Sequence, residues 1–283
     1  MVVMSASLPS VDELVASAVV VSLPLRTSFR GISHREVMLL RGTNGPSEWA
    51  AFPEYPDEEA ARWLTSALEQ GFDSSFPLFP TTTRIPVNAT FPALPAHEVE
   101  SWFSHFPGTT TAKIKVAEPG SSIQDDIARV GEVRRVMGPR ATLRLDANGG
   151  WTLETAIATL NKLSEFGIDY VEQPVATVAE MIELKPQVGR IGIRLAADEL
   201  VRKSPTPEDI FDTRLAAIAV LKVGPLGGMR RTLELARQAT SAGMEVVISS
   251  GLETSVGLTT GLLTAHHLRE STGHIPDTGL GTA

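Results

Sequence analysis

The chain has 283 residues, a formal net charge of −8 and no cysteine. The lack of cysteine excludes disulfides, thiolate nucleophiles and cysteine-bound zinc. Because the six histidines show no HExxH-like spacing, any metal site is expected to use oxygen ligands. No basic, aromatic-rich block is present in the sequence, so the composition favours a small-molecule partner and argues against nucleic acid.

Residues 1–84 are predicted to form a small α+β domain. The segments 16–25 (ASAVVVSLPL) and 35–42 (REVMLLRG) favour two antiparallel strands, and 57–71 (DEEAARWLTSALEQG) favours a helix. The run at 16–25 is too short to span a bilayer and follows acidic rather than basic residues, so we expect a cytoplasmic chain without membrane contact. The segment FPLFPTTTRIP marks the boundary to a second domain, residues 85–283.

From about Ile85 onward, short apolar runs alternate with amphipathic helical segments. Helical patterns cover 122–138, 152–167 and 229–243, and the last two end in Gly167 and Gly243, where a glycine commonly closes a helix. This alternation predicts parallel strands joined by crossover helices. The expected strands are 85–91, 112–118, 141–149, 168–174, 193–199, 217–224, 245–251 and a less distinct one near 277–283.

Two architectures would produce this alternation. A doubly wound open sheet is one, but the chain has no GxGxxG after its first strand. The count of eight strand candidates favours the other, a (β/α) barrel in the α/β class.

Polar residues interrupt the apolar strands at nearly the same point in each. Intervals of 31, 26, 26, 24 and 27 residues, about one βα unit each, separate Lys115, Asp146, Glu172, Asp198, Lys222 and Ser249. In a barrel these positions share one height at the carboxyl ends of the strands, where barrel active sites are built. Taken singly, such residues are usually helix caps, surface ion-pair partners or turn residues. Six such residues, each about one βα unit from the next, favour a functional site.

The three acids among these residues predict a cation site. Carboxylates on adjacent strands repel one another unless a cation lies between them. Asp146, Glu172 and Asp198 would supply the hard oxygen ligands that Mg²⁺, or alternatively Mn²⁺, prefers.

The lysines on either side of the acids predict general base chemistry. In the strand TAKIKVAE, residues 111–118, Lys113 and Lys115 share one face. Lys115 and Lys222 flank the acids and could approach a substrate from opposite sides. A lysine beside a divalent cation and another lysine is expected to have a lowered pKa, and it could then act as a general base.

Six segments together carry a family resemblance. In chain order they are AKIKV, LRLDANGGW, YVEQP, AADE, VLKVGPLGG and SSGLETSVG. This ordered set resembles the enolase superfamily, its muconate-lactonizing-enzyme branch, and within that branch the o-succinylbenzoate synthases of actinobacterial type. The likeness extends from about Leu25 to the last residue.

The resemblance implies a fold and an activity. The fold is a modified (β/α) barrel with an N-terminal α+β capping domain. The activity is a magnesium-assisted dehydration, a lyase reaction of menaquinone biosynthesis. It removes the proton α to the carboxylate of succinyl-hydroxy-cyclohexadiene-carboxylate, a small-molecule carboxylate substrate, and yields o-succinylbenzoate.

The resemblance also implies a role for each matching residue. Lys115 corresponds to the base that later helps water leave, Lys113 to its electrostatic neighbour and Lys222 to the opposing cation that stabilises the enolate. The metal ligands would be Asp146, Glu172 and Asp198. The substrate contacts would be Arg144 at the carboxylate, Ser249, Ser250 and Gly251 at the succinyl end, and Ser28 and Arg30 in a covering loop, with Glu199 as a partner of the ligands.

The sequence departs from the family pattern in two places. Family members usually continue past GLGT, so we expect a shortened C-terminal end of the barrel domain, which leaves its closure open. The segment NGPSEWAAF stands where the family more often has a GWGE-like sequence, with Glu48 retaining the acid.

Three other functions are compatible with these residues. N-acylamino acid racemases and dipeptide epimerases of the same superfamily use the same proton-removal step. A Schiff-base aldolase barrel would use Lys222 as its nucleophile. A non-catalytic barrel is the third, and the oligomeric state is open in every case.

Overall fold

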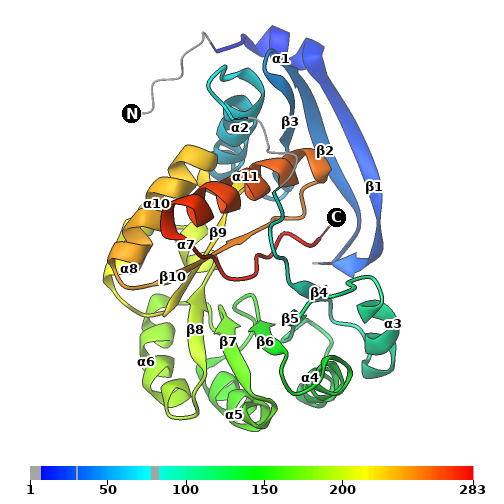
Figure 1. Cartoon of the computed structure of the whole chain (residues 1–283), viewed down its shortest axis with the longest axis vertical. Coiled ribbons are helices and arrows are strands. Elements are labelled where there is room, and N and C mark those ends of the chain that lie inside the picture. Colours follow the sequence, from blue (N-terminus) through cyan, green and yellow to red (C-terminus); the bar gives the residue numbers. More distant parts are fainter. Residues whose placement is uncertain (1–7, 30, 78–82, 283) are drawn as a thin grey trace. The chain divides into compact units, whose positions relative to one another are not determined.

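The computed structural model describes residues 8–29, 31–77 and 83–282, and Figure 1 shows how its elements follow one another along the chain. The contacts among residues divide the chain into two units. The first contains Met1–Ile85, Leu221–Ala236 and Ile248–Ala283, and the second contains Pro86–Val220 and Arg237–Val247. The division therefore passes through two strands of the larger sheet. The domain boundary predicted from the sequence stays a prediction.

The first unit contains a three-stranded antiparallel sheet in the order β1-β2-β3. Strand β1 (Ala18–Phe29) pairs with β2 (Ile32–Gly42), and β2 pairs with β3 (Gly45–Trp49). Helix α1 (Val11–Ser17) precedes the sheet and helix α2 (Asp57–Phe72) follows it. The two predicted strands and the predicted helix are confirmed, and β3 is a strand that the sequence prediction missed.

Helix α2 forms the core of this unit because its apolar side chains face the sheet. Trp63 packs with Val37 and Ala50, while Ala67 packs with Leu40. Trp63 is 2% exposed and also lies against α9 (Val223–Leu226), a short helix 160 residues further along the chain. Gly224 in α9 leaves room for the indole, since an added Cβ there would lie 2.5 Å from Trp63 Cε3.

The larger sheet has seven strands in the order β10-β9-β8-β7-β6-β5-β4. Neighbouring strands from β4 to β9 pair in parallel. The strands are β4 (Ala89–Phe91), β5 (Thr111–Lys115), β6 (Thr142–Asp146), β7 (Ile168–Glu172), β8 (Arg194–Ala197), β9 (Ile218–Lys222) and β10 (Glu245–Ser249). The predicted α/β fold with parallel β/α units and an antiparallel N-terminal sheet is confirmed.

The eighth predicted strand, near 277–283, is not a strand in the described part of the chain. Gly279 makes a single parallel bridge to Ser249 at the end of β10. The segment DTGLGT has two glycines and few branched apolar side chains, so it has little intrinsic strand preference and contributes isolated bridge residues instead of a ladder.

Helices connect the parallel strands, and α4, α5 and α6 pack along β5 to β8 (Figure 1). Ser122, Thr152 and Thr177 cap their N-termini by accepting backbone N–H bonds. Gly167 and Gly243 have φ of 65° and 83°, which confirms the helix ends predicted there. The helices and short turns are η1 (Ala96–Glu98), α3 (Val99–Phe103), α4 (Ile123–Met137), α5 (Leu153–Leu163), η2 (Ser164–Phe166), α6 (Val178–Gly189), α7 (Glu199–Arg202), α8 (Pro207–Asp212), α10 (Met229–Ser241) and α11 (Ser255–Thr272).

The two faces of the parallel sheet carry different side chains. Ile114, Leu143 and Leu145 are fully buried on one face, between the sheet and its helices. The other face carries Tyr170, which packs with Ala196 and Ile218 from the next two strands. This second face is equally buried, yet its residues near the strand ends are charged, and the site lies there. No helix in the described residues is long and apolar enough to cross a membrane.

The contact between Gly224 and Trp63 generates a stability prediction. Gly224→Ala should lower the free energy of unfolding by about 1–3 kcal/mol, the usual cost of overpacking a core, because the indole has no room to move away. Gly189→Ala is the matched control, since nothing lies within 4 Å of the Cβ it adds at the end of α6. Thermal or urea unfolding measures both, and an unchanged melting temperature for Gly224→Ala would contradict the packing described.

Candidate active site

The register of the parallel strands brings charged residues to one height on one face. Lys115 lies opposite Asp146, and Asp146 lies opposite Glu172. One step back along the strands, Lys113 lies opposite Arg144. Side chains alternate between faces in a strand, so these residues share the face of Tyr170.

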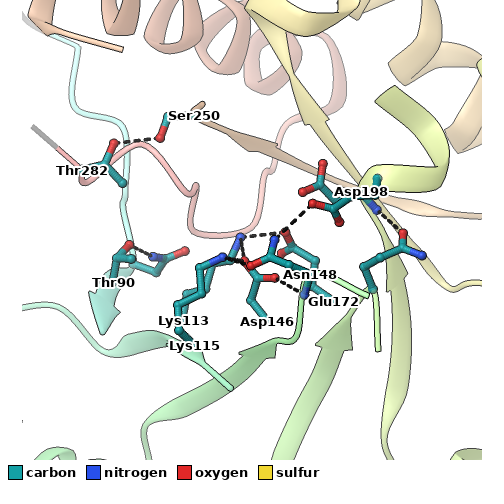
Figure 2. A network of polar contacts seen from close by, with 12 residues as sticks. Thr90, Lys113, Lys115, Asp146, Asn148, Glu172, Asp198, Ser250 and Thr282 are labelled. Carbon is teal, nitrogen blue, oxygen red and sulfur yellow. Dashed lines mark hydrogen bonds and ion pairs between the residues drawn. The ribbon is translucent and has the colours of Figure 1, made fainter. Parts of the chain in front are cut away.

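Lys113 connects two of the carboxylates. Its ammonium nitrogen lies 2.9 Å from Asp146 Oδ2 and 2.7 Å from Glu172 Oε1. The residue is 7% exposed, while Asp146 and Glu172 are 1% and 0% exposed, so solvent does little to separate these charges. Figure 2 shows the lysine ammonium and the two carboxylates converging from β5, β6 and β7.

Lys115 shares the same carboxylate and begins a further chain of polar contacts. Its Nζ donates to Asp146 Oδ2 at 2.7 Å and also to Asn148 Oδ1. Asn148 has a φ of 47° and its Nδ2 donates to Glu199 Oε1 at 3.1 Å. Lys115 is therefore held by contacts from the end of β6, and Asn148 connects it to Glu199 after β8.

Asp198 immediately follows β8, at the start of α7. It is completely buried, and Arg202 Nε approaches its Oδ1 at 3.5 Å. Its backbone N–H donates to Gln173 Oε1 at 3.2 Å, a contact that ties the end of β8 to the residue after β7. Arg202 also contacts Glu199 at 3.2 Å, and the role of Glu199 as a partner of the metal ligands stays a prediction.

Arg144 is 4% exposed and faces the same interior as the lysines. Its guanidinium carbon lies 5.1 Å from the centre of the Tyr170 ring, within the range of a cation–π contact. Burial raises the pKa of the Tyr170 phenol, so this side chain stays neutral and offers its ring and its hydroxyl to the interior.

The carboxylates decide the protonation of Lys113. Burial alone would lower the pKa of its ammonium, but the negative charges of Asp146 and Glu172 raise that pKa well above its ordinary value. The lowered pKa predicted for the base concerns Lys115 beside a bound cation, and it stays a prediction.

The donor types fit a hard divalent cation. Asp146, Glu172 and Asp198 offer carboxylate oxygens from the ends of three successive strands, and such oxygens are what Mg²⁺ prefers. Within the described residues, no three His, Cys, Asp or Glu side chains are spaced to hold a metal as they stand. The Lys113 ammonium occupies the position of positive charge between two of the acids, so a cation would have to displace it from them.

The remaining predicted residues belong to the first unit. Lys222 ends β9, and Ser249 is buried at the end of β10. Ser250 Oγ lies 2.7 Å from Thr282 Oγ1, as Figure 2 shows, and the Gly251 N–H donates to Glu253 Oε2 at 2.6 Å. Ser28 is an exposed residue of β1, and Arg30 lies outside the described residues.

Sequence reasoning did not single out four residues that contact these groups. They are Asn148, Tyr170, Gln173 and Glu253. Tyr170 lies two residues before Glu172 in β7 and therefore shares its strand face, a signal that could have found it. Asn148 lies in the turn after β6, where strand alternation gives no such signal. Gln173 directly follows a predicted ligand, and its role depends on a φ of 40° that no pattern in the sequence indicates.

Comparison with family models identifies both parts of the chain. The model described as "Enolase C-terminal domain-like" matches residues 98–276, and the model "Enolase N-terminal domain-like" matches residues 20–71.

Curated relatives resemble the chain over most of its length. The o-succinylbenzoate synthase of Mycolicibacterium smegmatis is 43% identical over 268 residues, which covers 94% of this chain and 80% of the relative. The o-succinylbenzoate synthase of Mycobacterium tuberculosis is also 43% identical, over 93% of this chain and 78% of the relative.

Solved structures share the fold at lower sequence identity. A dipeptide epimerase from Enterococcus faecalis, complexed with Mg and the dipeptide L-Leu-L-Tyr, has a TM-score of 0.74 at 20% identity, over 93% of this chain and 88% of that one. The muconate lactonizing enzyme of Pseudomonas putida has a TM-score of 0.72 at 20% identity, over 93% and 86%.

The bridging contacts of Lys113 generate a prediction about metal binding. In EDTA, Lys113→Met should lower the free energy of unfolding by about 3 kcal/mol, because it removes one partner from a buried ion-pair cluster. Added Mg²⁺ should then raise the melting temperature of this variant more than that of the unchanged chain, since the cation no longer competes with the ammonium. Lys162→Met, on the exposed side of α5, is the control. An equal or smaller Mg²⁺ effect in Lys113→Met would argue against a cation at these acids.

Proposed function

Because the chain belongs to the enolase superfamily, and within it to the family of o-succinylbenzoate synthases, we propose that it dehydrates succinyl-hydroxy-cyclohexadiene-carboxylate to o-succinylbenzoate in menaquinone biosynthesis. The family resemblance read from the sequence motifs is confirmed. The observation that carries the proposed reaction is the buried face of β5 to β7, where Lys113 and Lys115 contact carboxylates at the strand ends.

The reaction needs a base that later serves as an acid. The Lys115 amine removes the proton α to the substrate carboxylate, and the electron pair of the broken C–H bond moves into that carboxylate. The pair then returns to form the new ring double bond as the C–O bond to the hydroxyl group breaks. Lys115, now an ammonium, donates its proton to the departing hydroxide, so the net products are o-succinylbenzoate and water.

We assign the metal to Asp146, Glu172 and Asp198, which would hold Mg²⁺ when it is present. When bound, Mg²⁺ would supply the positive charge that enolase-superfamily sites use to stabilise negative charge on the substrate carboxylate. Mn²⁺ has the same ligand preference and would substitute for it.

The other residues orient the substrate or balance its charge. Lys222 stabilises the enolate as a second cation, and Lys113 balances the acids beside the base. Arg144 holds the substrate carboxylate through a guanidinium that presents a fork of donors. Ser249, Ser250 and Gly251 hold the succinyl end, and Ser28 and Arg30 cover the bound substrate.

Racemisation or epimerisation is the second candidate function. The solved structures that share this fold include a dipeptide epimerase and an N-succinyl Arg/Lys racemase. Both classes of reaction start with removal of a proton α to a carboxyl group, so the same lysines would serve. The Schiff-base aldolase and non-catalytic alternatives have no counterpart among the relatives described above.

Direct assay of the dehydration tests the proposal. The purified chain should convert succinyl-hydroxy-cyclohexadiene-carboxylate to the aromatic product, lose that activity in EDTA and regain it when Mg²⁺ is added. N-succinylamino acids in D₂O provide the comparison, because racemase activity exchanges their α-proton for deuterium. Exchange without any dehydration would replace the proposed function by the second candidate, and dehydration that persists through exhaustive chelation would remove the metal from it.

The role of Lys115 as base gives a separate prediction. Lys115→Ala should lower kcat by about a hundredfold or more, the usual scale for loss of a general base. Lys115→Arg should be almost as damaging, because a guanidinium does not lose its proton in the working pH range. Steady-state kinetics measures both variants, with Lys162→Arg on the exposed side of α5 as the control. Wild-type turnover in either Lys115 variant would assign the proton transfer to another residue.

A further inference from the structure

The segment that follows β10 is held by two carboxylates of the first unit. Glu253 Oε2 accepts the Gly251 N–H at 2.6 Å. Glu48, which is 5% exposed in β3, accepts the Thr254 N–H through Oε1 at 2.9 Å and the Gly257 N–H through Oε2 at 2.9 Å. Thr254 is also the N-cap of α11, so Glu48 completes that helix end from a strand more than 200 residues earlier.

The backbone between these anchors is strained. Leu252 has a φ of 66°, a conformation that a branched apolar residue rarely adopts and that usually costs about 1 kcal/mol or more. Arg35 stabilises it, because its Nε donates to the Leu252 carbonyl at 3.0 Å while its guanidinium lies 4.0 Å from the centre of the Phe52 ring. The contact with Arg35 therefore holds this turn in a conformation that the sequence of the turn does not favour.

Neighbouring side chains leave this segment no room to shift. A Cβ added at Gly251 would lie 2.5 Å from Trp63 Cη2, and one added at Gly257 would lie 2.7 Å from Glu253 Cβ. Gly251 thus packs directly against the core tryptophan of the first unit. Its position is fixed by the indole on one side and by its hydrogen bond to Glu253 on the other.

Burial and a neighbouring carboxylate oppose the ionisation of Glu253. Burial raises the pKa of its carboxyl group to about 6, and the nearby Glu48 carboxylate acts in the same direction. The Gly251 N–H and the Arg35 guanidinium act against this rise and favour the ionised form. Because the pKa is raised in the folded chain, the protonated form stabilises the fold below about pH 4.5, and this stabilisation is lost as the pH rises through about 6.

We propose that Glu253 and Glu48 are positioning residues that fix the Ser249–Gly251 segment for the succinyl carboxylate of the substrate. This inference rests on the proposed function, because it takes that segment as the succinyl contact. The two side chains touch the loop and not the reacting bond, so they set how tightly the remote end of the substrate binds. At neutral pH, keeping Glu253 ionised and bonded to Gly251 lowers the stability of the fold. Such a loss of stability is common where a conformation serves binding.

The test uses Glu253→Gln and Glu48→Gln, with Glu36→Gln on the exposed side of β2 as the matched control. At pH 7.5, Glu253→Gln should raise the melting temperature by about 2 °C or more, because it removes a disfavoured charge, and the gain should vanish at pH 5. A neutral amide oxygen accepts the Gly251 N–H more weakly than a carboxylate does. The variant should therefore raise KM about tenfold and leave kcat within about twofold, which is the pattern for lost binding remote from the chemistry. Glu48→Gln should raise KM similarly and lower the melting temperature, because an amide NH₂ cannot accept the Gly257 N–H. The control should match the unchanged chain throughout.

Hydrogen exchange of the Gly251 amide, measured without substrate, separates this inference from the proposed function. Exchange should be faster in both variants than in the control. An unchanged KM in Glu253→Gln, in a chain that does dehydrate the substrate, overturns the inference, and so does unchanged exchange at Gly251. Absence of dehydration in the unchanged chain overturns the proposed function instead, while the exchange rates still show whether the carboxylates hold the segment.

Discussion

The pairing of buried ammonium and carboxylate groups is the constraint on which the parallel-sheet site depends. An isolated ion taken out of water costs several kcal/mol, so each of these groups has to lie against an opposite charge. Lys113 satisfies two carboxylates and Lys115 shares one of them with it. The pairing holds both lysine side chains on this face, at the strand ends where the proposed proton transfer takes place.

The features predicted from the sequence are those that repeat with the βα unit. Lys115, Asp146 and Glu172 lie at equivalent points of successive strands, and the parallel register converts that spacing into one height on one face. The pattern also predicted the seven strands of the larger sheet and helices α2, α4, α5 and α10, because period-two and helical hydrophobicity dominate buried segments. The direction of the Lys113 pKa shift could not be read from spacing, since it depends on which oxygens the ammonium contacts.

Features produced by long-range packing were not predictable in the same way. Strand β3 consists of GPSEW, whose residues alone are typical of a turn. It becomes a strand because it pairs with β2. The capping of α11 by Glu48 joins residues more than 200 positions apart, and neither residue alone indicates the other. Gly279 likewise pairs with Ser249 through one bridge that no local preference determines. In each case tertiary context overrides local propensity.

The first unit is assembled from segments far apart in the chain, and this has a consequence for its synthesis. Trp63 and Arg35 find contacts at Gly224 and Leu252, which a ribosome adds well over a hundred residues later. The antiparallel sheet therefore emerges with part of its core uncovered, and it stays so until the residues around Leu252 have been added. Domains usually fold in order of their emergence, but this sheet is completed only after the parallel strands that follow it have been made.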